Sequence, residues 1–221
     1  MEPSAHRAES TLPGKTSHLA AVLDEYPQRD AVMALLGRLR DHHPASVGHS
    51  VRVAQALHAM ALEGPAYVGD VATAMIAGLL HDIGKLRVPP ATLDSERGLD
   101  KVSLDLIRAH PEAGAAILAE AGLPPVIIDV ARGHHERWRG GGYPGGLPAT
   151  AQPPLARAVA VADALVAMVE PGRPYRKPLP RDAALLELET CAGLHFDPEA
   201  TAILIAAASR RHGGLDALLG A

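Results

Sequence analysis

The sequence predicts an all-α fold built as a single helical bundle domain, and three observations carry this prediction. Apolar residues recur at helical spacing: Val32, Leu35, Leu36 and Leu39 stand at i, i+3, i+4 and i+7. Hydrophobic residues make up 48% of the chain but aromatic residues only 3%, so the core must consist mainly of Leu, Val, Ile and Ala, which favours packed helices over a β-sandwich. No stretch of useful length alternates with the two-residue period of a strand.

The helices are expected in order along residues 17–221. The preceding residues, 1–16, are polar and hold two prolines and one glycine, so we expect a disordered tail there. The helix that contains Val32 should end near His43, because Pro44 disfavours helical geometry in the residue before it. Further helices are expected at residues 49–62, 71–81, 102–109, 111–121, 124–135, 155–169, 181–192 and 198–211.

Proline, glycine and capping residues mark several helix ends. Pro111 suits a first helical turn, and Asp197 suits an N-cap. The segment 71–81 is apolar nearly all round, so we expect a central, buried helix with Gly84 as its C′ residue. Residues 86–100 are expected to form a loop.

Composition excludes several classes of function. The formal net charge of −4 argues against a protein that binds nucleic-acid polymers, which would need a basic surface. The single cysteine, Cys191, excludes an internal disulfide and a cysteine-based zinc site, and we expect it to be a small core residue. The most apolar run, residues 155–169, is shorter than the roughly 20 residues that span a bilayer. No signal peptide is evident at the N-terminus, so we expect a cytoplasmic protein without a membrane partner.

A set of histidines and aspartates lies at helix ends or inside apolar helices. Each has a simpler explanation when taken alone, such as a helix cap for a histidine, or an ion pair with Arg157 or Arg132 for Asp163. A buried carboxylate must be protonated, paired or bound to metal, and mixed imidazole and carboxylate ligands suit Mn, Fe, Zn or Ni. Together these residues predict a metal site. They are His49, His81, Asp82, His110, His134, His135 and Asp163.

The other histidines are assigned no ligand role. His42 and His43 stand before Pro44 and read first as a helix terminus, whereas His58 and His195 have no acidic or histidine neighbour in the sequence. The remaining ones lie in tail-like or terminal polar segments: His6, His18 and His212.

Six short motifs resemble those of the HD-GYP domain, the subset of the HD phosphohydrolase superfamily associated with hydrolysis of cyclic di-GMP. The resemblance covers about residues 42–205 and implies an all-helical domain with a buried multi-metal centre, usually of iron or manganese. The motifs are HDIGK at 81–85, HPEAG at 110–114, HHER at 134–137, GGYPGGL at 141–147, VAD at 161–163 and RPYR at 173–176.

The resemblance also implies which residues hold the metals. His49 would be the first-helix ligand, Asp163 would bind the first metal, and His81 and Asp82 would form the HD pair, with Asp82 bridging both metals. The second metal would be completed by His110, His134 and His135. Three-metal members carry a glutamate one helical turn before the first histidine. That position is Ala45 here, so we expect two divalent ions, Fe or Mn.

The implied function is hydrolysis of cyclic di-GMP to pGpG or GMP by a metal-bridging hydroxide, with Asp82 and Lys85 as catalytic residues. Lys85 would stabilise charge that develops on the phosphate. The substrate would be contacted by Lys85, Gly142, Tyr143, Pro144, Arg173 and Lys177. Without the resemblance, the glycine-rich stretch at 141–147 would be interpreted as a plain connecting loop, and the basic stretch at 173–177 as a solvated turn.

Three positions depart from the family pattern. Arg139 and Val166 stand where the family has aspartates, and Ser95 stands where it usually has a lysine. These departures concern substrate orientation and turnover more than metal binding. Two alternatives therefore stay open: a degenerate HD-GYP module that binds a nucleotide with little turnover, and an HD phosphohydrolase for another nucleotide. Regulation would come from a homodimer, a regulatory protein partner or the redox state of the metal.

Overall fold

The computed structural model describes residues 17–95, 98–171 and 177–210, and within them the chain is all-α, as predicted. The described residues form no strand, apart from an isolated bridge between Ala192 and Phe196. The predicted tail, Arg173, His6 and His212 lie outside the described residues. The helices are α1 (Ser17–Glu25), α2 (Arg29–His42), α3 (Pro44–Glu63), α4 (Pro65–Val68), α5 (Val71–Leu80), the 3-10 helix η1 (Ile83–Arg87), α6 (Pro90–Leu93), α7 (Lys101–Arg108), α8 (His110–Glu120), α9 (Pro125–Gly133), the 3-10 helix η2 (Ala149–Ala151), α10 (Pro154–Val169), α11 (Arg181–Cys191) and α12 (Pro198–Arg210).

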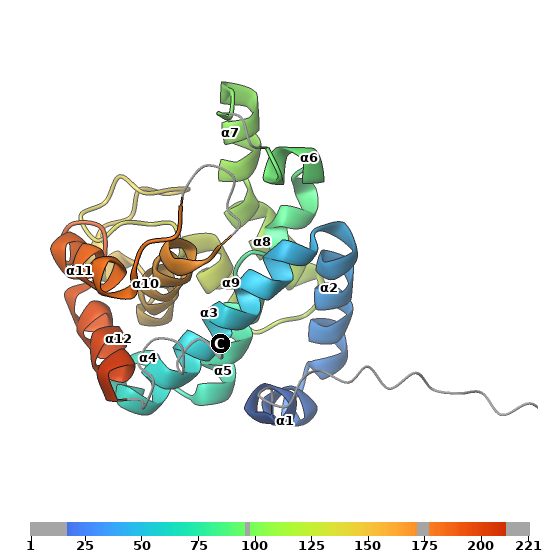
Figure 1. Cartoon of the computed structure of the whole chain (residues 1–221). Helices are drawn as coiled ribbons and strands as arrows, with labels where there is room; N and C mark the ends of the chain where they lie inside the picture. The colour runs from blue at the N-terminus through green and yellow to red at the C-terminus, as the bar shows by residue number, and fades with distance from the viewer. Residues whose placement is uncertain (1–16, 96–97, 172–176, 211–221) are drawn as a thin grey trace, which may run out of the picture.

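The longest helix, α3, packs along α5 and forms the centre of the bundle (Figure 1). Helix α5 is buried from Ala74 to Leu80, as its uniformly apolar sequence predicts. Gly78 lets the two helices approach closely, because a Cβ there would lie 2.8 Å from the Cα of Ala54. Helices α2, α10 and α12 also pack on α3, and α9 packs on α5, α8 and α10.

The start of α3 differs from the prediction, which placed it at His49. The helix begins at Pro44, because Pro44 occupies a first-turn position and the His43 side chain accepts a hydrogen bond from the backbone N–H of Ser46 (3.2 Å). His49 therefore lies inside α3 and not at its end. The expected break after α2 is confirmed, since α2 ends at His42.

The prediction for Gly84 is also wrong. The chain after α5 continues through the HD pair into η1, and Gly84 does not adopt a left-handed conformation. It instead lies where η1 meets the start of α8, and a Cβ there would overlap the carbonyl oxygen of His110. The expected loop at 86–100 includes the end of η1 and the short helix α6.

Asp197 caps α12 as predicted, accepting from the backbone N–H of Glu199 at 2.7 Å. Its carboxylate also accepts from Arg157 at 2.5 Å and from the hydroxyl of Tyr67 at 2.6 Å. Cys191, expected in the core, is only partly buried at the end of α11. No helix in the described part of the chain is long and apolar enough to cross a membrane.

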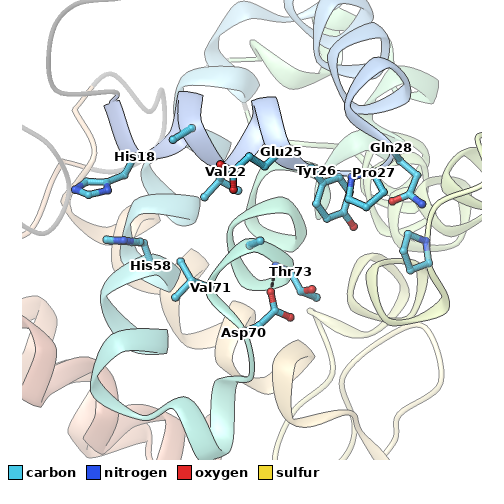
Figure 2. Close-up of a pocket in the computed structure, with 13 residues that line it drawn as sticks. His18, Val22, Glu25, Tyr26, Pro27, Gln28, His58, Asp70, Val71 and Thr73 are labelled. Carbon is cyan, nitrogen blue, oxygen red and sulfur yellow. Dashed lines mark hydrogen bonds between the residues drawn. The ribbon is translucent and has the colours of Figure 1, made fainter.

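A pocket of about 580 Å³ lies between α1, α3 and the beginning of α5 (Figure 2). His18 and His58 line it, and their rings stack with centroids 5.3 Å apart. This corrects the prediction for His18, which belongs to α1 and not to a tail. His58 has no histidine neighbour in the sequence but has one in space. Asp70 also lines the pocket, and it caps α5 through the backbone N–H of Thr73 at 2.9 Å.

Candidate metal centre

The structure brings all seven singled-out residues together in two adjacent groups. In each group the potential ligand atoms lie within 4.8 Å of one another. The first group is His49, His81 and Asp163, and the second group is Asp82, His110, His134 and His135. Only Asp163 and His135 are partly exposed; the other five residues are buried.

The first group joins α3, the end of α5 and the middle of α10. His49 Nε2 lies 2.8 Å from Asp163 Oδ1, and His81 Nε2 lies 4.0 Å from the same oxygen. Asp163 therefore does not form an ion pair with Arg157 or Arg132, the two partners considered from the sequence. Arg157 binds Asp197, and Arg132 contacts Glu112 and Asp129 on the surface.

Asp82 belongs to the second group and also faces the first. Its Oδ1 faces the second group, 3.2 Å from His110 Nε2 and 3.9 Å from His134 Nε2. Its Oδ2 lies 3.3 Å from Nε2 of His81, a member of the first group, and accepts from Lys85 Nζ at 2.5 Å. One carboxylate thus presents an oxygen to each group.

Backbone carbonyls determine the tautomers of three histidines. Nδ1 of His81 lies 2.8 Å from Gly78 O, Nδ1 of His110 lies 2.6 Å from Ile107 O, and Nδ1 of His134 lies 2.9 Å from Ala131 O. A carbonyl oxygen can only accept, so each Nδ1 carries a proton, and the lone pair of the neutral form of each ring would then be on Nε2, which faces the site.

The described part of the protein offers these Nε2 atoms too few hydrogen-bond donors. His81 Nε2 is buried without a hydrogen-bond partner among the described residues, and His110 Nε2 and His134 Nε2 face each other at 3.2 Å. Buried acceptors that face one another are unfavourable unless a proton or a cation lies between them. Imidazole nitrogens and carboxylate oxygens are borderline ligands, so the donor set fits divalent transition metals.

The electrostatics favour the protonation states that bind metal. Burial lowers the pKa of His135 to about 4, and burial with the neighbouring histidines lowers the pKa of His134 well below its usual value. Burial alone would raise the pKa of Asp82, but Lys85 and His81 hold it well below the usual range. Burial likewise opposes ionisation of Asp163, whose pKa is nonetheless lowered by its hydrogen bond with His49. Neutral imidazoles and ionised carboxylates are the forms that coordinate a cation.

The glycine-rich loop, residues 141–147, packs directly against the second group. The ring of Tyr143 stacks on His135 with centroids 4.7 Å apart, and the Tyr143 N–H donates to His135 O at 3.2 Å. Gly142 allows this approach, because a Cβ there would lie 2.5 Å from His135 O. Pro144, joined to Tyr143 by a cis peptide bond, is exposed on the loop.

Two acidic residues of the site were missed by sequence reasoning. The buried carboxylate of Glu136 holds the glycine-rich loop, accepting from the backbone N–H of Gly145 at 2.6 Å and of Leu147 at 2.9 Å. Glu170, at the end of α10, lies 3.1 Å from His49 Nδ1. Glu136 could have been noticed in the sequence, because it directly follows His134 and His135. No local sequence pattern connects Glu170 with His49.

The remaining predicted residues lie at the margin of the centre or beyond it. Lys177 is exposed, and Ala45 is exposed in the first turn of α3. Among the departures, Val166 is buried in the core and Ser95 is partly buried after α6. The Arg139 side chain donates from Nε to Gly193 O at 3.0 Å, so its guanidinium is held by the segment between α11 and α12.

The chain matches a known protein family and is similar to several known proteins. A family model described as an HD domain matches residues 35–200. The chain is 34% identical over 190 residues to the cyclic di-GMP phosphodiesterase PA4108 of Pseudomonas aeruginosa, covering 83% of this chain and 45% of that protein. It is 32% identical over 194 residues to the 3'3'-cGAMP-specific phosphodiesterase 3 of Vibrio cholerae, covering 87% and 41%. The chain thus spans less than half the length of these curated relatives.

A solved structure has a similar fold. It is the HD domain of the phosphodiesterase PgpH of L. monocytogenes in complex with cyclic-di-AMP, with a TM-score of 0.57 and 20% identity, covering 85% of this chain and 94% of that one. At this level of identity the likeness concerns the fold alone.

Proposed function

We propose that this chain, which belongs to the HD domain family, is a metal-dependent phosphodiesterase that hydrolyses cyclic di-GMP to pGpG or GMP. The observation that carries the proposal is the position of Asp82, whose two carboxylate oxygens face histidine nitrogens of two separate groups. Two ions held in this way would neutralise phosphate charge and lower the pKa of a water that attacks phosphorus. The relatives named for cyclic di-GMP and cGAMP support a cyclic dinucleotide as the substrate class.

The chain's own residues would divide the work as follows. The first group would hold one ion and the second group the other, with Fe or Mn suited to this donor set. An exposed alanine at position 45 offers no carboxylate for a third ion. Lys85 is partly exposed beside Asp82, so its ammonium would stabilise negative charge on the scissile phosphate.

The substrate contacts are proposed on the side of the glycine-rich loop. Tyr143, stacked on His135, would place its ring against a purine or orient a phosphate, beside Gly142 and Pro144. Arg173 and Lys177 would hold the second phosphate, since a guanidinium matches phosphate geometry.

The test is a turnover assay on anaerobically purified protein loaded with Fe(II) or Mn(II), with metal content measured on the same sample. We expect about two ions per chain and linear product from cyclic di-GMP, with 3'3'-cGAMP and cyclic di-AMP as parallel substrates. Tight cyclic di-GMP binding without hydrolysis in either metal would instead indicate a nucleotide-binding module. Hydrolysis of another nucleotide with cyclic di-GMP left intact would change the assigned substrate.

Replacing Glu136 with glutamine is expected to raise the KM for the dinucleotide about tenfold while two metals stay bound. Both oxygens of Glu136 accept backbone N–H groups of the loop, whereas glutamine keeps one acceptor and turns an NH₂ group toward the other N–H. Loss of one charge-assisted hydrogen bond is worth roughly 1.5–3 kcal/mol, the equivalent of about tenfold or more. The measurement is KM and kcat, determined separately.

Glu112→Gln is the matched control, because Glu112 is an exposed glutamate whose carboxylate lies 3.4 Å from the side chain of the surface residue Arg132. Its KM should equal that of the wild type. An unchanged KM in Glu136→Gln would show that the loop position set by Glu136 does not matter for substrate binding.

A further inference from the structure

We infer that Glu170 is a positioning residue that orients His49 for the first metal ion. This inference rests on the proposed function, since it assigns a role toward the first group of the metal centre. Glu170 lies directly after α10, and its side chain is 12% exposed. His49 Nδ1 lies 3.1 Å from Glu170 Oε2, on the side of the ring opposite to the Nε2 atom that faces Asp163.

His49 differs from three other histidines of the centre in its place on its helix. His81 and His134 are C-cap residues, and His110 follows the end of α7. Carbonyls of a last helical turn lack partners within the helix, so the Nδ1 of each of these histidines donates to a carbonyl three residues earlier.

His49 has no such carbonyl available, because it lies in the interior of the 20-residue helix α3, where the preceding carbonyls accept helical N–H groups. Its Nδ1 proton therefore needs an acceptor from another element. Glu170 supplies this acceptor. Two carboxylates seven residues apart, Asp163 in α10 and Glu170 directly after it, thus contact the two nitrogens of one imidazole.

Arg52 holds Glu170 in this position. It lies on α3 one turn after His49 and forms an ion pair with Glu170 Oε1 while Oε2 faces the ring. The ion pair thereby keeps the other carboxylate oxygen directed at Nδ1. When Nε2 binds metal in place of its hydrogen bond with Asp163, a carboxylate acceptor keeps the ring proton on Nδ1 and makes the Nε2 lone pair more basic.

The experiment is a Mn(II) titration of the metal-free full chain, followed by calorimetry and by electron paramagnetic resonance, which separates isolated from coupled ions. We expect Glu170→Ala to weaken one of the two binding events about 10- to 100-fold and to leave the other unchanged. The coupled-pair signal should then need correspondingly more Mn(II). Glu170→Gln should be intermediate, because its amide oxygen still accepts a proton but carries no charge.

Asp94→Ala is the matched control. Its carboxylate contacts His43 Nε2 at 3.1 Å, which is another imidazole–carboxylate pair but lies outside both groups. Both binding events should match those of the wild type. Thermal unfolding of the metal-free variants gives a further comparison: if Glu170 were only structural, both events would weaken together with the melting temperature.

The outcomes separate this inference from the proposal on which it rests. Fewer than two ions in the wild-type chain would remove the two-metal centre itself. Two ions in the wild type and two unchanged binding events in both Glu170→Ala and Glu170→Gln would overturn the role of Glu170 alone. If Glu170→Ala does not fold, Glu170→Gln decides, and wild-type affinity at both sites in that variant would exclude a role for the charge.

Discussion

Replacing Asp82 with alanine is expected to lower turnover by about 1,000-fold or more and to reduce the bound metal to below two ions per chain. The two carboxylate oxygens of Asp82 face histidines of both groups. Its loss would remove an anionic ligand, leaving the first ion with two imidazoles and one carboxylate and the second ion with three imidazoles. Metal ions contribute several kcal/mol to stabilising the charge of such a transition state, and every 1.36 kcal/mol is a factor of ten in rate.

The measurement is kcat for the proposed substrate, together with metal content by mass spectrometry. Asp94→Ala serves again as control, because it removes an exposed aspartate that contacts a histidine outside the centre. Circular dichroism should show that Asp82→Ala keeps its helices, since the residue lies after α5 and caps no helix through its side chain. Two bound ions with a rate within tenfold of the wild type would contradict the bridging role.

The helices were largely predictable because their signals are local. The apolar spacing around Val32 and the Asp197–Pro198 start of the last helix reappear as α2 and α12. The start of α3 was not predictable in the same way, since it depends on a histidine side chain acting as the cap. The role of Gly84 was missed because its constraint comes from α8, which is remote in the sequence.

Six of the seven residues of the candidate centre lie in short sequence motifs and His49 stands at the expected start of a helix, so all seven could be singled out from the sequence, but their chemistry could not. Which ring nitrogen of His81 or His134 faces the site follows from carbonyls at helix ends, and this becomes evident only when the ends of the helices are known. Glu170 gave no signal, because its contact with His49 spans 121 positions. Arg139 could be recognised as a departure, but its contact with Gly193 O depends on how the segment after α11 returns to the loop.

Gly84→Ala is expected to destabilise the metal-free protein by about 3 kcal/mol or more and to weaken metal binding at the second group. A Cβ at this position would overlap the carbonyl oxygen of His110 and lie 2.5 Å from the backbone nitrogen of Gly114. Both obstacles are backbone atoms of α8, so no side-chain rotation can make room. Helix α8 would have to move away from η1, taking His110 away from Asp82.

Gly37→Ala is the matched control, because it makes the same chemical change in α2 at a glycine whose Cβ would meet no atom of the described residues within 4 Å. Alanine is the better helix former by about 1 kcal/mol, so this variant should be as stable as the wild type or slightly more stable. Thermal unfolding and Mn(II) titration of the two variants therefore separate a general effect of alanine from the contact between η1 and α8. If Gly84→Ala kept both its stability and its second-group affinity, the close approach of Gly84 to His110 would not be what holds that histidine beside Asp82.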